Sequence, residues 1–264
     1  MKVLNQDKDP SQFFSSLKQS ESRTLLLDYD GTLAPFKVKR DKAFPYPGVG
    51  EVLKQIIRQG ATRLVVVSGR RAEELIALLG LKEPPEIWGS HGGERLLADG
   101  TYQKGTLSRQ DRRALEAAAA WMAEMGWGPF LERKPFGLAL HWRGMKNQEK
   151  RNMQEKALDH VPLLVAGTGL CLQAFDGGLE LRPPGITKGE VVETILAEMQ
   201  TDTVATYLGD DLTDEDAFAT LKRHGPLGLG VLVREELKKT KADLWLRPPD
   251  ELLDFFRRWQ KATL

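Results

Sequence analysis

The sequence predicts an α/β protein: a parallel sheet with helices on both faces, interrupted by a smaller α+β domain. Two observations predict the sheet. Short, continuous apolar runs end in polar or glycine turns, and each then gives way to a helical pattern. Such uninterrupted apolar runs are typical of parallel strands buried on both faces. The third observation predicts the inserted domain, because the middle of the chain follows the order helix–strand–strand–helix–strand–strand.

Three runs predict the central strands. They are the stretch 24–27 before DYDGT, RLVVVSGRR at 63–71, and TVATYLGDD at 203–211. Apolar residues at helical spacing predict the helices that lie between and after them. The remaining core elements are helices at 49–59, after residue 71, at 189–199, after residue 211 and at 251–259, and a strand at 229–233.

The middle of the chain predicts a separate α+β unit. Its elements are a helix at 109–125, two strands within 131–143, a polar helix at 147–161 and two strands within 169–183. We therefore expect a discontinuous core domain formed by residues 1–105 and 181–264, with residues 106–180 inserted as a second domain.

The amino-acid composition limits which partners and which cellular compartment we expect for this chain. The chain has 264 residues and a net charge of +1, which gives no electrostatic reason to expect nucleic acid or an anionic membrane as a partner. No apolar stretch approaches the ~20 residues that a membrane span needs, and the first residues lack the apolar core of a signal peptide. The single cysteine, Cys171, cannot form an internal disulfide. We expect a cytoplasmic protein.

Acidic side chains follow two of the predicted strands. Asp28 and Asp30 end the first run, Asp210 and Asp211 end the third, and Ser68 ends the second. Ligands of open parallel sheets bind outside the carboxyl ends of the strands. If the three strands are neighbours, the four carboxylates repel one another and need a cation or shared protons. An all-oxygen ligand set without histidine or cysteine favours Mg²⁺ over zinc.

A purely structural interpretation competes with this one. Asp-Gly is a common turn pair, and GDD is ordinary loop chemistry. Thr213 followed by Asp216 resembles a capping box, so we interpret Glu215 and Asp216 as structural. Asp210 has no such role, and Asp214 could serve either purpose. Since both acidic motifs follow apolar runs in one chain, the metal site is the favoured hypothesis.

Basic residues open two predicted helices. Arg70 and Arg71 begin one and Lys188 begins another, although the helix dipole disfavours cations at that end. A bound anion would reverse the sign of this effect, and helix N-termini are natural phosphate sites. We expect Ser68 and Lys188 to bind phosphate and Arg71 to be solvated. No GxxxxGK[ST] pattern is present, so the site is not a Walker-type nucleotide site.

Taken together, the DxDGT strand end, the strand ending in serine, the lysine at a helix start and GDDxTDE resemble the haloacid dehalogenase superfamily. The inserted unit resembles the larger (type C2B) cap of its phosphosugar branch. Further motifs are similar to trehalose-6-phosphate phosphatases. They are LLLDYDGTLAPF, VVSGR, GSHGGE (89–94), an ERK…LALHWR element (132–143), LELRPPGITKG (179–189) and YLGDDLTDEDAF (207–218). Two positions depart from that family, with Trp142 where tyrosine is usual and Gly137 where serine is frequent.

The resemblance implies a role for each acidic residue. Asp28 is the nucleophile and is phosphorylated on its side chain. Asp30 protonates the leaving sugar oxygen and then activates the attacking water. The Mg²⁺ ligands are Asp28, the backbone carbonyl of Asp30, and Asp210, with Asp211 or Asp214 as outer support.

The resemblance also implies which residues bind the substrate. Ser68, Gly69 and Lys188 hold the phosphoryl group, while the cap closes over the core and binds the sugar. His141 and Arg143 are expected on one side of a strand. The substrate-binding set implied by these motifs is Arg70, His91, Gly92, Glu132, Lys134, His141, Arg143, Glu180 and Arg182.

The leading hypothesis is a Mg²⁺-dependent phosphatase that releases trehalose and phosphate from trehalose 6-phosphate. Three alternatives stay open: a phosphatase for another sugar phosphate (sucrose phosphate or a glycosylated phosphoglycerate), a phosphomutase, and a non-catalytic sugar-phosphate sensor. We expect a monomer that binds a small sugar phosphate, and association with a trehalose-phosphate synthase is a further possibility.

Overall fold

The computed structural model describes residues 1–37, 39–175 and 177–264, and the chain divides into two compact units. The core unit comprises Met1–Gln103 and Thr187–Leu264, and the inserted unit comprises Lys104–Ile186. The second junction therefore falls after residue 186, later than the predicted 180. The reason is that β10 (Gly178–Arg182) pairs with β8 (Gly137–His141) and so belongs to the sheet of the inserted unit.

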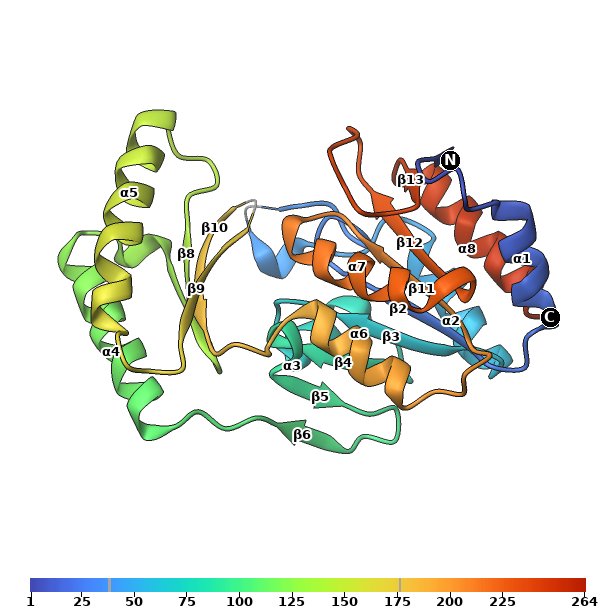
Figure 1. Cartoon of the computed structure of the whole chain (residues 1–264), viewed down its shortest axis with the longest axis horizontal. Coiled ribbons are helices and arrows are strands. Elements are labelled where there is room, and N and C mark those ends of the chain that lie inside the picture. The colour runs from blue at the N-terminus through green and yellow to red at the C-terminus, as the bar shows by residue number, and fades with distance from the viewer. Residues whose placement is uncertain (38, 176) are drawn as a thin grey trace. The chain divides into compact units, whose positions relative to one another are not determined.

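The core unit is built on a nine-stranded sheet whose central strands are parallel (Figure 1). The order at its centre is β12-β11-β2-β3-β4, so the three strands that carry the acidic and serine motifs are direct neighbours. The edges add antiparallel pairings of β1 and β5 that the sequence did not predict. The strands are β1 (Lys2–Val3), β2 (Arg23–Leu27), β3 (Arg63–Val67), β4 (Glu86–Gly89), β5 (Glu94–Leu96), β6 (Tyr102–Lys104), β11 (Val204–Gly209), β12 (Gly228–Val233) and β13 (Leu244–Leu246).

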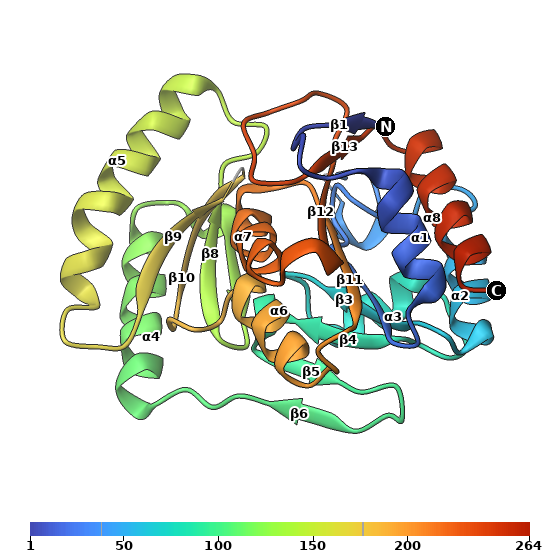
Figure 2. The same cartoon turned by 45° about the vertical axis from the view of Figure 1, so that its right-hand side comes forward.

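Helices cover both faces of this sheet, which explains why its strands are apolar throughout (Figure 2). Leu25 and Leu27 of β2 pack in one apolar cluster, and Leu26 packs in another on the opposite face. The first cluster includes residues of α1 (Pro10–Gln19), α2 (Val49–Gln59), α3 (Ala72–Leu79) and α8 (Asp250–Ala262); the second includes α6 (Lys188–Ala197) and α7 (Glu215–Arg223).

The inserted unit has the predicted order of elements. Its four-stranded antiparallel sheet runs β7-β8-β10-β9. Leu138 and Leu140 of β8 pack with the buried residues of both helices, so the residues between them face the other side of the sheet. The other elements are α4 (Arg109–Glu124), β7 (Leu131–Lys134), α5 (Asn147–Leu164) and β9 (Cys171–Phe175).

Two details at helix starts differ from the prediction. The helix after β3 begins at Ala72, so Arg70 precedes it. The capping box near residue 214 is formed by Asp211, which precedes the short 3-10 turn η4 (Leu212–Asp214), and by Asp214, which ends it. Thr213 and Asp216 do not form it. The prediction was wrong because the chain makes a separate 3-10 turn before α7 begins.

Candidate active site

The carboxyl ends of β2 and β11 bring the two acidic motifs together. The backbone N–H of Asp28 donates to the carbonyl of Leu208 at 2.9 Å. Gly31 has a φ of +92°, and a Cβ added to it would lie 2.3 Å from Oδ2 of Asp210. Only glycine fits this position, since it tolerates the positive φ and leaves room for the carboxylate. The glycine of the DGT turn is therefore what lets residues 28 and 210 approach.

Three buried carboxylates share one ammonium group. Asp28, Asp210 and Asp214 each have an oxygen within 4.8 Å of the other two. Lys188 donates from Nζ to Oδ1 of Asp28 at 2.5 Å and to Oδ1 of Asp214 at 2.7 Å. Burial raises the pKa of Asp28 to about 7 although Lys188 opposes this shift, and burial raises the pKa of Asp210 well above its usual range. The cluster therefore lacks positive charge.

Two oxygens of this cluster fit a metal ion. Oδ2 of Asp28 and Oδ1 of Asp210 are buried and have no hydrogen-bond partner within residues 1–37, 39–175 and 177–264. Buried carboxylate oxygens normally find a partner, so this pair fits a bound cation. Carboxylate oxygens without nitrogen or sulfur ligands suit Mg²⁺.

Asp214 holds the site together. Its Oδ1 accepts hydrogen bonds from Lys188 and, at 2.5 Å, from the hydroxyl of Tyr207. Its Oδ2 accepts the backbone N–H groups of Asp210 at 3.0 Å and Asp211 at 2.8 Å. Both oxygens are thus already occupied, and Asp214 fixes the loop that presents Asp210. Tyr207 was not predicted from the sequence, where its signal is an aromatic hydroxyl within an apolar strand.

Tyr207→Phe is expected to reduce the free energy of unfolding by about 1.5–3 kcal/mol, the usual contribution of a hydrogen bond to a charged group. Tyr29→Phe is the matched control, because Tyr29 is equally buried but donates to a neutral acceptor, the carbonyl of Ala43, at 2.7 Å. This control is expected to lose about 0.5–1.5 kcal/mol. Urea unfolding measures both values, and equal losses would contradict the role given to Asp214.

Asp30 is held by an arginine. Arg70 donates from Nε to Oδ2 of Asp30 at 2.6 Å and from Nη2 to Oδ1 at 2.7 Å, and its Nη1 donates to the carbonyl of Arg40 at 2.8 Å. Burial alone would lower the pKa of Arg70, but the hydrogen bonds and charge of Asp30 raise it. Arg70 was expected to bind the substrate, and this bidentate contact, which fixes the orientation of the Asp30 carboxylate, was not predicted.

A second loop packs against the end of β3. The carbonyl of Ser68 accepts the N–H of His91 at 2.8 Å, and a Cβ on Gly69 would lie 2.5 Å from Nε2 of His91. His91 has a φ of +57°, which is rare for a side-chain-bearing residue. A Cβ on Gly92 would lie 2.6 Å from Cγ2 of Val191, so the same loop packs on the helix that Lys188 begins. These predicted phosphate- and substrate-binding residues are thus gathered in one place.

Glu94 supports this loop and was also missed. It is buried, and its Oε1 accepts the hydroxyl of Ser90 at 2.9 Å. Its Oε2 accepts the backbone N–H of Ala72 at 3.2 Å, at the start of α3. One carboxylate therefore links the strained turn to the helix beside it. In the sequence, the glutamate that ends GSHGGE was the signal that could have identified this residue.

Five of the other predicted residues lie on the face of the inserted unit's sheet that is opposite its helices. His141 and Glu132 are hydrogen-bonded at 2.7 Å, and Lys134 donates to Glu180 at 2.9 Å. Arg182 donates from Nη2 to Oε1 of Gln173. This face of the sheet is therefore charged and rich in hydrogen-bonding atoms, and Glu180 and Arg182 are buried on it.

Three further positions lie in the stretch GLALHWR (137–143). Strand β8 ends at His141, so the alternation argument does not place Arg143, which is exposed beyond the strand. A Cβ on Gly137 would lie 2.6 Å from the carbonyl oxygen of Leu181, so a serine here would require a backbone shift. Trp142 is buried, and the ammonium of Lys150 lies 5.6 Å from its ring centroid.

The fold is that of the haloacid dehalogenase-like hydrolases. A hydrolase of this type from B. subtilis aligns with a TM-score of 0.62 at 13% identity, covering 89% of this chain and 98% of that chain. The C-terminal domain of a trehalose-6-phosphate phosphatase from C. albicans aligns with a TM-score of 0.82 at 22% identity, covering 95% and 96%.

The sequence model of the trehalose-phosphatase family matches residues 26–249, and the chain belongs to this family. A trehalose-phosphate phosphatase of Mycobacterium ulcerans is 32% identical over 247 residues, which cover 89% of this chain and 60% of the relative. A bifunctional trehalose-6-phosphate synthase/phosphatase of Thermoproteus tenax is 31% identical over 221 residues, covering 83% and 29%. The chain thus spans only part of the length of these relatives.

Proposed function

We propose that this chain is a Mg²⁺-dependent phosphatase that hydrolyses trehalose 6-phosphate to trehalose and phosphate. The observation that carries the proposal is the convergence of Asp28, Asp210 and Lys188 at neighbouring strand ends, in a chain of the trehalose-phosphatase family. This cluster combines a nucleophile, unsatisfied carboxylate oxygens and a fixed cation, which are the groups that phosphoryl transfer requires.

In the proposed mechanism, a side-chain oxygen of Asp28 attacks phosphorus and the bond to the sugar oxygen breaks. Asp30 donates its proton to that leaving oxygen. A water molecule then attacks the phosphorus of the aspartyl phosphate, and Asp30 takes its proton. The bond between phosphorus and the Asp28 oxygen breaks, which frees inorganic phosphate and restores the Asp28 carboxylate. The bidentate contact with Arg70 supports the second step, because it holds the Asp30 carboxylate in one orientation when it takes the proton of the water.

The metal would be held by Asp28, Asp210 and the backbone carbonyl of Asp30. Asp214 is proposed as the outer support in preference to Asp211, because its four hydrogen bonds already fix the loop and Lys188. When bound, Mg²⁺ would offset the repulsion between the phosphate and the Asp28 carboxylate. We assign the phosphoryl oxygens to Ser68, Gly69 and Lys188, which are grouped near the start of α6.

The inserted unit is proposed as the cap that binds the sugar. Its charged sheet face offers carboxylate, ammonium and imidazole groups at hydrogen-bonding distances from one another, and sugar hydroxyls can both donate to and accept from such groups. The residues proposed to contact the sugar are Glu132, Lys134, His141, Arg143, Glu180 and Arg182, together with His91 and Gly92 of the core unit.

The proposal is tested by measuring phosphate release from a panel of sugar phosphates. We expect kcat/KM for trehalose 6-phosphate to exceed that for sucrose 6-phosphate, glucose 6-phosphate and a glucosylated phosphoglycerate by at least about tenfold, since buried polar groups left unpaired disfavour the wrong sugar. Trehalose and phosphate should appear in equal amounts. Trehalose 6-phosphate ranking below the others, or transfer of phosphate to a second sugar hydroxyl with little free phosphate, would refute this assignment.

Two further proposals concern the cellular setting. Within residues 1–37, 39–175 and 177–264, no helix has both the length and the apolar character that crossing a membrane requires. A free, exposed Cys171 agrees with a reducing compartment, which supports the proposed cytoplasmic location. The fused synthase and phosphatase of Thermoproteus tenax supports association with a trehalose-phosphate synthase as a proposal for this chain. The monomeric state stays a prediction.

A further inference from the structure

The charged face of the inserted unit's sheet also carries the phenyl ring of Phe175. This residue ends β9 and pairs in register with Gly178 of β10, and Gly178 pairs in turn with His141 of β8. Paired residues of antiparallel strands point to the same face of a sheet. The side chain of Phe175 therefore lies on the same face as His141, opposite the helices.

A glycine between the two rings lets them meet. A Cβ added to Gly178 would lie 2.5 Å from Cζ of Phe175, so the phenyl ring takes the space that a side chain would fill. The ring meets the imidazole of His141 edge-on, with centroids 5.5 Å apart. A Cβ on Gly177 would lie 3.0 Å from Nη2 of Arg143 and 3.2 Å from Cε2 of Phe175. Two of the residues proposed to contact the sugar thus flank the phenyl ring.

Phe175 is the one large apolar side chain that the described strand residues place on this face. The other side chains that point the same way from β7, β8, β9 and β10 are charged or polar, or as small as alanine and cysteine. Phe175 itself is only half-buried, so part of its ring is open to a ligand. Sites for small molecules combine apolar or aromatic surface with a few placed polar groups, and this face has both.

We propose that the phenyl ring of Phe175 packs against the apolar C–H face of a pyranose and helps to select the sugar. This inference rests on the proposed role of the inserted unit in binding the sugar. The glucopyranose rings of trehalose carry their ring hydroxyls equatorially, which leaves axial C–H groups as a flat apolar face for an aromatic ring. His141 and Arg143, beside the phenyl ring, serve hydroxyls at the edge of the sugar. An acyclic polyol phosphate offers no such face.

The proposal is tested by titrating the full chain with trehalose and measuring binding by saturation-transfer NMR, which requires no turnover. Phe175→Ala is expected to weaken trehalose binding by about tenfold, because the aromatic contact is lost. Phe175→Trp keeps an aromatic ring at this position and should bind within about twofold of the parent. The melting temperature of each variant shows whether the fold has persisted.

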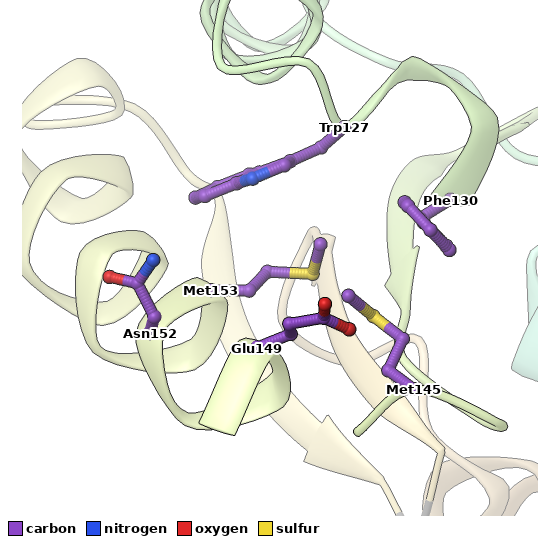
Figure 3. A pocket seen from close by; sticks show the side chains of 6 residues that line it. All are labelled: Trp127, Phe130, Met145, Glu149, Asn152 and Met153. Carbon is purple, nitrogen blue, oxygen red and sulfur yellow. The ribbon is translucent and has the colours of Figure 1, made fainter. Parts of the chain in front are cut away.

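Phe130→Ala is the matched control. Phe130 is another exposed phenylalanine of the inserted unit, and with Trp127 and Met153 it lines a hollow of about 320 Å³ (Figure 3). Trp127 and Met153 belong to the apolar cluster on the helical side of the sheet, so Phe130 lies away from the charged face. Its variant should bind trehalose like the parent.

Steady-state kinetics provide the second measurement. Phe175→Ala should lower kcat/KM for trehalose 6-phosphate about tenfold further than kcat/KM for glycerol 2-phosphate, which has no pyranose ring, and the loss should lie in KM. The proposal is overturned if trehalose does not bind the parent, or if Phe175→Ala loses no more affinity than Phe130→Ala. A parent that binds trehalose through Phe175 but releases no phosphate from trehalose 6-phosphate would refute the proposed phosphatase and support this inference.

Discussion

Asp28→Asn is expected to reduce phosphate release by at least about a thousandfold, because an amide cannot form the covalent phosphoryl intermediate. The fold should persist. Asparagine has nearly the shape of aspartate, and burial already raises the pKa of Asp28 to about 7, so the folded state favours a neutral group at this position. Steady-state phosphate release and the melting temperature, Tm, measure the two effects, and Tm is expected to stay the same or rise.

Asp216→Asn is the matched control for this variant. Asp216 carries the same change of group and lies in the first turn of α7, where its side chain is exposed. Its turnover should match that of the parent. An Asp28→Asn protein that hydrolyses trehalose 6-phosphate at the parent's rate would show that another residue is the nucleophile.

Removing divalent cations with excess EDTA is expected to lower turnover by at least about a hundredfold, and added Mg²⁺ should restore it. The physical reason is the charge balance of the site, where three buried carboxylates face the single ammonium of Lys188. Without a cation, a phosphate anion entering this site meets further negative charge. Activity that survives excess chelator would remove Mg²⁺ from the mechanism.

The same charge balance gives a pH dependence for stabilisation by Mg²⁺. The pKa of Asp28 rises from 3.8 in the unfolded chain to about 7 in the metal-free fold, and that of Asp210 is raised as well. Their contribution to stability is therefore complete below about pH 4 and is lost as the pH rises through 7. Mg²⁺ competes with these protons, so it should raise Tm more at pH 8 than at pH 5.

Thermal shift assays at the two pH values measure this difference. Asp210→Asn, which removes one of the two unsatisfied oxygens from the carboxylate set, is expected to show a smaller Mg²⁺-dependent rise of Tm at pH 8. Asp254→Asn, an exposed change on α8, is the control and should behave like the parent. Equal shifts at pH 5 and pH 8 would place the ion away from these carboxylates.

The sequence alone predicted the central strands, because a strand buried on both faces must be apolar throughout. Leu25, Leu26 and Leu27 pack alternately on the two faces of the sheet, as that prediction requires. It also predicted the order of elements in the inserted unit, because amphipathic helices and short strands have different periods. Within the site, the sequence predicted the acidic residues at the ends of β2 and β11, because each pair stands in one short motif.

Only the tertiary structure decided which side chains meet. The contact between Arg70 and Asp30 joins residues 40 positions apart, and the Gly31 turn reaches Asp210 only because β2 and β11 are neighbours. The position of the second domain junction and the hydrogen bond of Tyr207 to Asp214 could not be predicted from the sequence either. A local pattern specifies the faces and ends of an element, whereas strand order and side-chain partners depend on how distant segments pack, and no single stretch of sequence contains that information.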